Sequence, residues 1–436
     1  MKKLAYYTLG CKANQYETEA IANEFLKHNF IVVNFSEGAD IYLINTCTVT
    51  NRADYKSRYI IRKVINYKRI NPAVKIIVTG CYTQKDYNLL KEWPEIDYFF
   101  HNNEKSHIVS YVLQNNKKIP QKFPLPLSFT RFDELSTDYF TKHTRAFVKI
   151  QDGCNYNCAY CIVPLVRGPC RSRCPHNIIT QVKRLSENGY KEIVLTGINL
   201  GSYRYKLHNY YLLDLIRDIS GIESVEQIRI SSIEHKFVTD EFIYFLRDND
   251  KICHHFHIPL QTGSNELLKS MRRNYSKEQF KWTIDKIKSA MPDSALGFDV
   301  IVGLPGETDK LFAESINFIS QIQPAYLHIF PYSQRKGTSA YNLKNQINGK
   351  IKSKRIQKLK ALNSKFVECF KQEVISKKII LRSILEERRN GYWTGVSDHY
   401  LRIYYKSKKA KKGQLLKFIS IEKFKDGILV RRSDSN

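Results

Sequence analysis

The sequence has no run of 18 or more consecutive apolar residues, although 42% of its 436 residues are hydrophobic. A transmembrane helix needs about 20 predominantly apolar residues, so we expect no membrane span and no membrane partner. The first residues, MKKLAYYTLGC, also lack a long apolar segment and a small-residue cleavage site. We therefore expect them to form a first strand in a cytoplasmic protein and not a signal peptide.

Acidic residues are scarce relative to basic ones. The chain has 42 Asp and Glu against 70 Lys and Arg, which gives a formal net charge of +28. Residues 350–436 alone carry 24 basic and eight acidic side chains. A tail this basic attracts polyphosphate backbones. We therefore favour a nucleic-acid partner over the alternative, a solvated basic surface in a lysine-rich organism.

A second Cys-x2-Cys pair is missing beside the Cys-x3-Cys-x2-Cys run formed by Cys154, Cys158 and Cys161. Structural zinc usually takes four protein ligands, and a cluster of four irons needs four ligands. Three thiols in eight residues therefore predict an iron–sulfur cluster with one iron open to another ligand. A surface loop with incidental cysteines is the less favoured alternative. Ten cysteines without a secretion signal also argue against a disulfide scaffold.

Three more cysteines follow a repeated unit in the first 115 residues. Strand-like runs at residues 4–10, 40–46 and 74–80 lead directly into Cys11, Cys47 and Cys81. Segments with a helical pattern follow each run, at residues 17–29, 53–69 and 84–93. This alternation predicts a parallel sheet, and functional groups gather beyond the carboxyl ends of such strands. We therefore predict a second site with three thiol ligands, against the alternative of three core cysteines.

A second βα series is predicted after a proline-rich linker at residues 116–143. The strand candidates are residues 145–151, 191–197, 226–231, 255–260, 295–303 and 325–331. Six such units make most of a (β/α)8 barrel but do not close one. Residues 345–378 look helical, and short strand-like runs follow. The predicted fold class is α/β, with an N-terminal parallel-sheet βα domain (1–115), a central partial (β/α)6 barrel (144–376) and a small C-terminal all-β barrel (377–436).

Several stretches resemble signatures of the radical S-adenosylmethionine (SAM) methylthiotransferases. They are TLGCKANQYETE, INTCTVTNRAD, VTGCYTQ, DGCNYNCAYCIVP, RISSIE, HIPLQTGSNELLKSMRR, DVIVGLPGET and HIFPYSQRKGTSA. The resemblance covers nearly the full chain and implies a radical SAM barrel followed by an RNA-binding TRAM barrel. Residues 10–19, GCKANQYETE, look like the branch that acts on threonylcarbamoyladenosine in tRNA.

The family resemblance implies a tRNA-modifying transferase that methylthiolates C2 of N6-threonylcarbamoyladenosine at position 37, in the anticodon loop. An aromatic C–H bond resists acid–base chemistry, so a radical route supplied by cofactors is reasonable. The resemblance implies two 4Fe–4S clusters and two SAM molecules per turnover. The cluster on Cys154, Cys158 and Cys161 would cleave one SAM to a radical. The auxiliary cluster on Cys11, Cys47 and Cys81 would hold the sulfur, which the second SAM methylates. No catalytic residue beyond the cluster ligands is predicted.

Other substrates and one other class of protein stay open. Within the family, the substrate could be isopentenyladenosine in tRNA or an aspartate of a ribosomal protein. The alternative outside it is a non-catalytic iron–sulfur RNA-binding redox sensor. We expect a monomer, and the sequence identifies neither the electron donor nor the sulfur source.

The family resemblance also suggests which residues contact SAM and which contact RNA. The SAM-binding candidates are Gly197, Asn199, Ser231, Ser232, Gln261, Gly303 and Glu307. Asn199 stands where an acidic residue is usual, and plain βα turns are the alternative for the glycines. The RNA-binding candidates are Arg167, Arg171 and Arg173, because guanidinium groups suit phosphates and stacked bases. Ion pairing within the barrel is the alternative for these arginines. Cys170 and Cys174 are taken as free thiols, and Cys253 and Cys369 as core residues.

Overall fold

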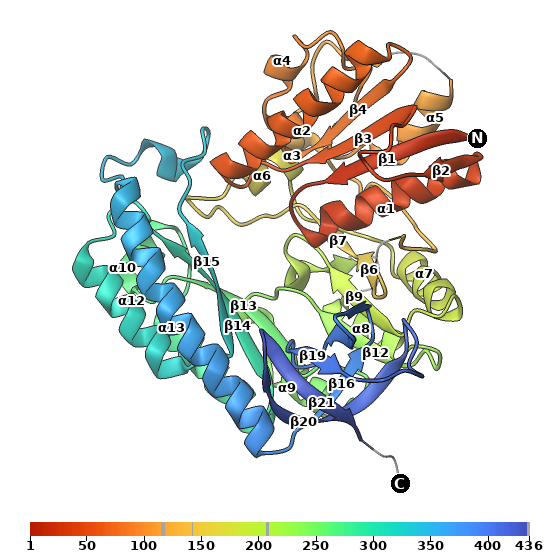
Figure 1. The fold of residues 1–436 in the computed structure, drawn as a ribbon. Helices are drawn as coiled ribbons and strands as arrows, with labels where there is room; N and C mark the ends of the chain where they lie inside the picture. Colours follow the sequence, from red (N-terminus) through yellow and green to blue (C-terminus); the bar gives the residue numbers. More distant parts are fainter. Residues whose placement is uncertain (115–117, 142, 206–208, 434–436) are drawn as a thin grey trace.

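The computed structural model describes residues 1–114, 118–141, 143–205 and 209–433. Figure 1 shows an N-terminal sheet at one end, a barrel-like region in the middle and a curled sheet near the C-terminus. The predicted boundary at residues 115 and 116 lies outside the described residues. The division of the chain into domains stays a prediction. Within the described part, no helix is long and apolar enough to cross a membrane.

The N-terminal sheet is parallel throughout, with strand order β2-β1-β3-β4-β5. Its strands are β1 (Lys2–Thr8), β2 (Phe30–Val32), β3 (Ile41–Thr46), β4 (Lys75–Gly80) and β5 (Tyr98–Phe99). Its helices are α1 (Lys12–Lys27), α2 (Asn51–Ile70), α3 (Cys81–Lys85), α4 (Tyr87–Leu90) and α5 (Ile108–Leu113). The three predicted strands are confirmed, whereas the third predicted helix is two short helices, α3 and α4.

Both faces of this sheet are buried, as expected for a parallel sheet. All six residues of β3 are buried. Leu43 belongs to a core shared with the barrel, whereas its neighbours Tyr42 and Ile44 belong to a separate core on the other face. The N-terminal sheet is thus joined to the barrel through one face, and α1 lies in that junction because it packs on both β1 and β6.

The middle region contains the six predicted strands, all parallel, in two three-stranded sheets. One sheet has the order β12-β9-β6 and the other β13-β14-β15. The strands are β6 (Ala146–Lys149), β9 (Glu192–Thr196), β12 (Gln227–Ile230), β13 (His255–Gln261), β14 (Ala295–Val302) and β15 (Tyr326–Pro331). A bridge between Ile228 of β12 and Ile252, in the segment that leads into β13, connects the two sheets. The predicted partial (β/α)6 barrel is therefore confirmed.

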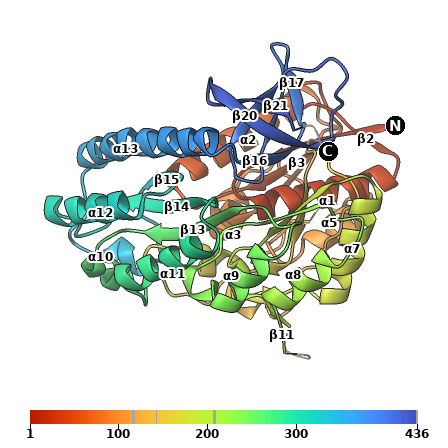
Figure 2. The ribbon, with the colours of Figure 1, turned by 90° about the horizontal axis from the view of Figure 1, so that it is seen from below.

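Helices alternate with these strands, as a βα series predicts. They are α7 (Pro175–Glu187), α8 (Leu212–Ser220), α9 (Asp240–Arg247), α11 (Lys277–Ala290), α12 (Asp309–Ile322) and the long α13 (Gly349–Ser376), which is the helix predicted at residues 345–378. In Figure 2, α12 and α13 lie side by side over the sheet of β14 and β15. Short elements occupy the loops, namely β7 (Gln151–Asp152), α6 (Val163–Arg167), β8 (Arg171–Ser172), β10 (Arg204–Tyr205), β11 (Tyr210–Tyr211) and α10 (Asn265–Ser270).

The C-terminal sheet curls on itself, as a small all-β barrel requires. Its order is β16-β20-β21-β19-β18-β17. The strands are β16 (Ile380–Ile384), β17 (Glu387–Arg389), β18 (Tyr392–Val396), β19 (Arg402–Tyr405), β20 (Leu415–Phe424) and β21 (Gly427–Arg432). A bridge from Ser383 to Ser397 brings β16 against the end of β18.

Cys253 is buried as predicted, but Cys369 lies on an exposed face of α13, so its prediction as a core residue is wrong.

Candidate functional site

The three N-terminal cysteines lie at the carboxyl ends of neighbouring strands. Cys11 precedes α1, Cys47 follows β3, and Cys81 opens α3. Thr46 and Gly80, the residues directly before Cys47 and Cys81, are partners in the register of β3 and β4. Burial and the neighbouring Cys81 thiol raise the pKa of Cys47 to about 12. Gly10 has a φ of +98°, and a Cβ there would lie 2.9 Å from Sγ of Cys47. Glycine therefore lets the Cys11 turn approach Cys47, and the structure brings the three predicted thiols together.

Amide side chains surround these thiols. Asn102 donates from Nδ2 to Sγ of Cys81 at 3.8 Å, and the Cys11 thiol lies 3.9 Å from Oδ1 of Asn14. Asn14 is fixed in turn, because its Nδ2 donates to the carbonyls of Leu9 and Thr46. Three sulfur donors with no fourth protein ligand beside them in the described residues fit an iron–sulfur cluster that has one open iron.

The second three-cysteine set forms the loop between β7 and α6. The backbone N–H of Tyr156 donates to Sγ of Cys154 at 3.4 Å, and Arg273 donates to Sγ of Cys158 at the same distance. Burial and the neighbouring Cys158 and Cys154 thiols raise the pKa of Cys161 to about 12. Donors directed at sulfur stabilise thiolates, so this loop also suits a cluster.

An unpartnered acceptor lies beside the Cys154 loop. Asn199 directs Nδ2 to Sγ of Cys154 at 3.7 Å, while its buried Oδ1 has no hydrogen-bond partner in the described structure. Its backbone is held by Gln151, whose Oε1 accepts from the N–H groups of Ile198 and Asn199. A Cβ on Gly197 would lie 3.0 Å from that same Oε1. A free carbonyl beside the cluster loop fits the ammonium group of an amino-acid ligand such as SAM.

The three arginines predicted to contact RNA are inside the protein. Arg167 and Arg173 are 1% exposed and Arg171 is 5% exposed. Arg173 donates to Glu134, and Arg171 donates to the carbonyls of Arg167 and Pro169. Their guanidinium groups therefore do not face a solvent-borne RNA. The alternative of internal ion pairing describes all three.

Arg167 belongs to a buried ionic network between the two cysteine sites. It contacts Glu17 of α1 and Asp152 of β7, each at 2.9 Å. Lys149 contacts the same two carboxylates, each at 2.6 Å, and Lys105 pairs with Glu17. Although burial alone would raise the pKa of Asp152, Arg167 and Lys149 hold it below its usual range. Arg171 also lies 3.7 Å from Asp152. Burial raises the pKa of Cys11 and Cys47, and the positive charge of Arg167 lowers it and so opposes that stronger effect.

The comparisons with known proteins decide the family. Residues 148–319 match the model of the radical SAM superfamily, and residues 3–101 match that of the uncharacterized protein family UPF0004. The chain is 40% identical over 425 residues to threonylcarbamoyladenosine tRNA methylthiotransferase MtaB of Bacillus subtilis, covering 96% of this chain and 93% of the relative. The chain belongs to the radical SAM methylthiotransferase family. It is therefore a transferase that uses SAM and a 4Fe–4S cluster.

Two more relatives agree with this family, and one solved structure has a similar fold. MtaB of Aquifex aeolicus is 36% identical, with 89% of this chain and 94% of the relative covered. The tRNA-2-methylthio-N(6)-dimethylallyladenosine synthase of Thermoanaerobacter sp. is 35% identical, with 84% and 79% covered. The radical SAM methyltransferase TsrM of Kitasatospora setae has a TM-score of 0.59 at 12% identity, covering 78% of this chain and 77% of that one, and it shares the fold.

The other SAM candidates of this methylthiotransferase divide into two groups. Ser231, Ser232 and Gln261 lie at the carboxyl ends of β12 and β13, and Oγ of Ser231 is buried without a partner in the described structure. Glu307, in contrast, is 2% exposed and is engaged within the chain. It accepts from the N–H of Gly303 at 2.7 Å and from Arg355 of α13 at 2.8 Å. Gly303 and Glu307 thus form a turn anchored to α13, which matches the alternative given for the glycines.

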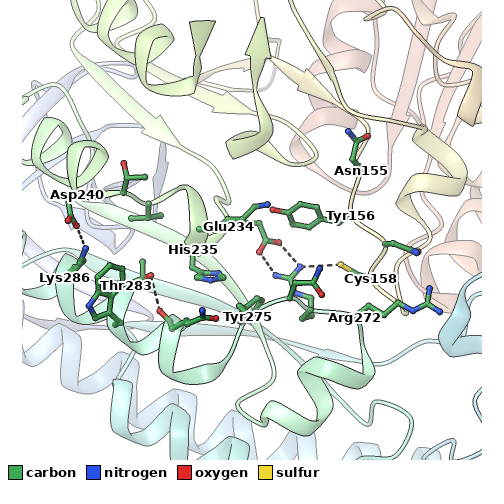
Figure 3. Close-up of a pocket in the computed structure, with 18 residues that line it drawn as sticks. Asn155, Tyr156, Cys158, Glu234, His235, Asp240, Arg272, Tyr275, Thr283 and Lys286 are labelled. Atoms are coloured by element: carbon green, nitrogen blue, oxygen red, sulfur yellow. Dashed lines mark hydrogen bonds and ion pairs between the residues drawn. The ribbon is translucent and has the colours of Figure 1, made fainter. Parts of the chain in front are cut away.

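A cavity of about 680 Å³ opens beside the radical-cluster loop. Figure 3 shows Tyr156 and Cys158 at one end of it and Asp240 and Lys286 at the other. Arg273 reaches both the Cys158 sulfur and Glu234, so it fixes the loop to the wall of the cavity. The cavity therefore gives solvent access to the radical-cluster loop.

The C-terminal sheet contributes residues to the far end of the barrel. Arg229 of β12 donates to the carbonyls of Ser397 and Asp398. The ring of Tyr400 stacks on His255, with 4.4 Å between ring centroids, and on Tyr326 at 5.0 Å. The C-terminal sheet is therefore fixed to the barrel through these contacts.

The sequence patterns did not single out several residues that shape the site. Gln151 and Arg273 are the main examples, because each orients a cluster loop from outside it. Both lie in stretches that resemble family signatures, next to DGC and within SMRR. Only the fold shows that they contact the Asn199 loop and the Cys158 sulfur. Their position in or next to a family signature was thus the one sequence signal that could have pointed to Gln151 and Arg273.

Proposed function

We propose that this protein converts N6-threonylcarbamoyladenosine at position 37 of tRNA into its 2-methylthio derivative. The observation that carries the proposal is the 40% identity with the B. subtilis enzyme over 96% of the chain. That relative is named for action on threonylcarbamoyladenosine, and so is the one from A. aeolicus. The GCKANQYETE stretch around Cys11 supports the same branch.

We also propose that two clusters and two SAM molecules serve each turnover. Cys154, Cys158 and Cys161 would hold the cluster that, with SAM, supplies a carbon-centred radical. Cys11, Cys47 and Cys81 would hold the auxiliary cluster that supplies the sulfur. Both ligand sets come from one chain and meet across the network of Arg167 and Glu17, so a monomer contains a complete site.

Residues of this chain would position the reactants. Oδ1 of Asn199 would accept from the ammonium group of SAM, because that atom lacks a partner in the described structure and lies in the loop that contacts Cys154. Arg273 and Glu234 would hold the Cys158 loop during the reaction. Exposed lysines of the C-terminal sheet, such as Lys408 and Lys412, would bind the phosphates of the anticodon arm.

An assay with purified, cluster-loaded protein tests the substrate. The reduced enzyme and SAM are incubated with tRNA that carries threonylcarbamoyladenosine or, in a matched reaction, isopentenyladenosine. We expect methylthiolation of the first tRNA and at least about tenfold less of the second, since buried polar recognition groups reject analogues that leave them unpaired. A preference for isopentenyladenosine would refute the proposed branch. Absence of deoxyadenosine release would instead favour the non-catalytic sensor.

A further inference from the structure

Three side chains on adjacent strands of the barrel converge on one point. His257 of β13, Asp299 of β14 and His328 of β15 belong to the parallel sheet in which Asp299 pairs directly with His328. Nε2 of His257 lies 3.1 Å from Oδ1 of Asp299 and 3.1 Å from Nδ1 of His328. Nδ1 of His328 lies 3.3 Å from the same Oδ1. The three atoms thus form a nearly equilateral triangle.

Hydrogen bonds alone leave this triangle crowded. A carboxylate oxygen only accepts, and each imidazole nitrogen carries either a proton or a lone pair. If both nitrogens are protonated, both N–H groups donate to the one Oδ1 of Asp299, with the two nitrogens only 3.1 Å apart. If either nitrogen is unprotonated, its lone pair faces the oxygen of Asp299. A cation at the centre relieves this crowding, because it accepts a lone pair from each atom.

The surroundings of His257 have the form found at metal sites. A ligating imidazole usually has its other nitrogen hydrogen-bonded, which fixes the tautomer and the ring orientation. Nδ1 of His257 lies 2.5 Å from Oγ of Ser232, which leaves Nε2 for the triangle. His257 is 8% exposed, so its ring is held by packing.

The site also has an open side. The side chains of Asp299 and His328 are 22% and 41% exposed, respectively. Catalytic metal sites characteristically combine three protein ligands with a position open to water or substrate. Two histidines and one carboxylate suit zinc or ferrous iron, both of which accept nitrogen and oxygen ligands.

We propose that His257, Asp299 and His328 bind one divalent transition-metal ion inside the barrel, separate from both cysteine sites. The loop after β12 connects this site with the radical-cluster loop. Its Ser232 contacts His257, while its Glu234 pairs with Arg273, which donates to Cys158. An ion in this position is one short loop away from the radical-cluster loop, and its open side takes an oxygen ligand. The proposal does not depend on which nucleoside is the substrate.

Zinc serves as the probe, because one additional ferrous ion is hard to detect in the iron content of a protein that also binds iron–sulfur clusters. Cluster-loaded protein is equilibrated with buffered zinc, freed of weakly bound metal and analysed for zinc and iron by mass spectrometry. We expect about one tightly bound zinc per chain in the wild type, with the iron content unchanged. Absence of tightly bound zinc from the wild type would overturn the proposal.

Variants locate the ion. His328→Ala removes the most exposed ligand, and we expect it to lose the zinc while it keeps its iron. Ser232→Ala should weaken zinc binding by about 10–100-fold, because it removes the group that orients His257. The matched control is His176→Ala, at an exposed position of α7, and it should bind zinc as the wild type does. Equal zinc in His328→Ala and the control would overturn the site.

X-ray absorption at the zinc edge checks the ligands independently of any variant. We expect nitrogen and oxygen neighbours at about 2.0–2.2 Å and no sulfur. Sulfur at about 2.3 Å would place the zinc in one of the cysteine sites and would contradict the proposal.

Discussion

Arg167 donates a hydrogen bond to Glu17 at 2.9 Å across 150 residues of sequence. Glu17 lies on the helix that Cys11 precedes, and Arg167 ends the helix that follows Cys161. Both side chains are at most 1% exposed. The two cysteine sites are therefore connected by a buried ionic contact, and neither site is a separate module.

Breaking this ion pair should destabilise the protein strongly. Arg167→Leu leaves Glu17 and Asp152 with less compensating charge in the interior, and we expect a loss of about 3–5 kcal/mol in the free energy of unfolding. Urea unfolding of the cluster-free protein measures it. The control is Arg69→Leu, which breaks an exposed pair with Glu95, and it should cost less than about 1 kcal/mol. Similar losses in the two variants would refute the role of the network.

The protein should become less stable as the pH is lowered, partly because of His235. This residue is 8% exposed and its ring lies tilted against that of Tyr275, with 4.3 Å between ring centroids. Burial, with the nearby cation of Arg273, lowers its pKa to about 4. Because the folded-state pKa lies below the unfolded value of about 6.5, the unfolded chain binds the extra proton. The contribution of neutral His235 to the free energy of unfolding is complete above about pH 6.5 and is lost as the pH falls toward about 4.

The variant His235→Asn should flatten this dependence. We expect the change in unfolding free energy between about pH 6.5 and 4 to shrink by about 2–3 kcal/mol, at about 1.36 kcal/mol per pKa unit. Denaturant titrations of the cluster-free protein at several pH values measure the slope. His176→Asn, at an exposed site, serves as the control and should leave the slope unchanged. An unchanged slope in His235→Asn would contradict the assignment.

Variants of the two cysteine sites should affect SAM cleavage and methylthiolation differently. Cys158→Ala removes a ligand of the radical cluster, so we expect loss of both deoxyadenosine release and methylthiolation. Cys47→Ala removes a ligand of the auxiliary cluster, so we expect deoxyadenosine release to continue while methylthiolation stops. Each variant should lose about four irons per chain. Cys369→Ala, at an exposed cysteine, is the control. Loss of SAM cleavage in Cys47→Ala with an intact radical cluster would contradict this division.

Affinity for tRNA should depend on the loop between β19 and β20. Lys408, Lys409, Lys411 and Lys412 are all exposed there. Replacing all four with glutamine should weaken tRNA binding and lower the slope of log K against log salt, by about 0.7–0.9 for each phosphate that is no longer neutralised. Binding isotherms at three salt concentrations measure it, with SAM cleavage as the control for folding. An unchanged salt slope would place the RNA elsewhere.

The sequence was sufficient for the architecture because strand periodicity and cysteine placement are local patterns. The runs that end at Cys11, Cys47 and Cys81 predicted three parallel strands and a common edge, and the structure has both. The two- and three-residue strands β5 and β2 went unpredicted, since so few residues show no period.

The arginine predictions show what a local pattern leaves out. Arg167, Arg171 and Arg173 resemble RNA contacts in the sequence because guanidinium groups suit phosphates. Glu17, the carboxylate partner of Arg167, lies far away in sequence, so this ion pair was invisible before the fold. The convergence of His257 with Asp299 and His328 likewise depends on strand register.

The most direct test of the proposed function is mass spectrometry of tRNA nucleosides. A host that lacks its own enzyme is transformed with this gene, and Cys158→Ala and the empty vector serve as controls. We predict that 2-methylthio-N6-threonylcarbamoyladenosine appears with the wild-type gene alone, while the unmodified threonylcarbamoyladenosine decreases. Its absence from cells that contain the soluble, cluster-loaded protein would contradict the proposed function, and appearance of 2-methylthio-isopentenyladenosine instead would identify the other tRNA branch.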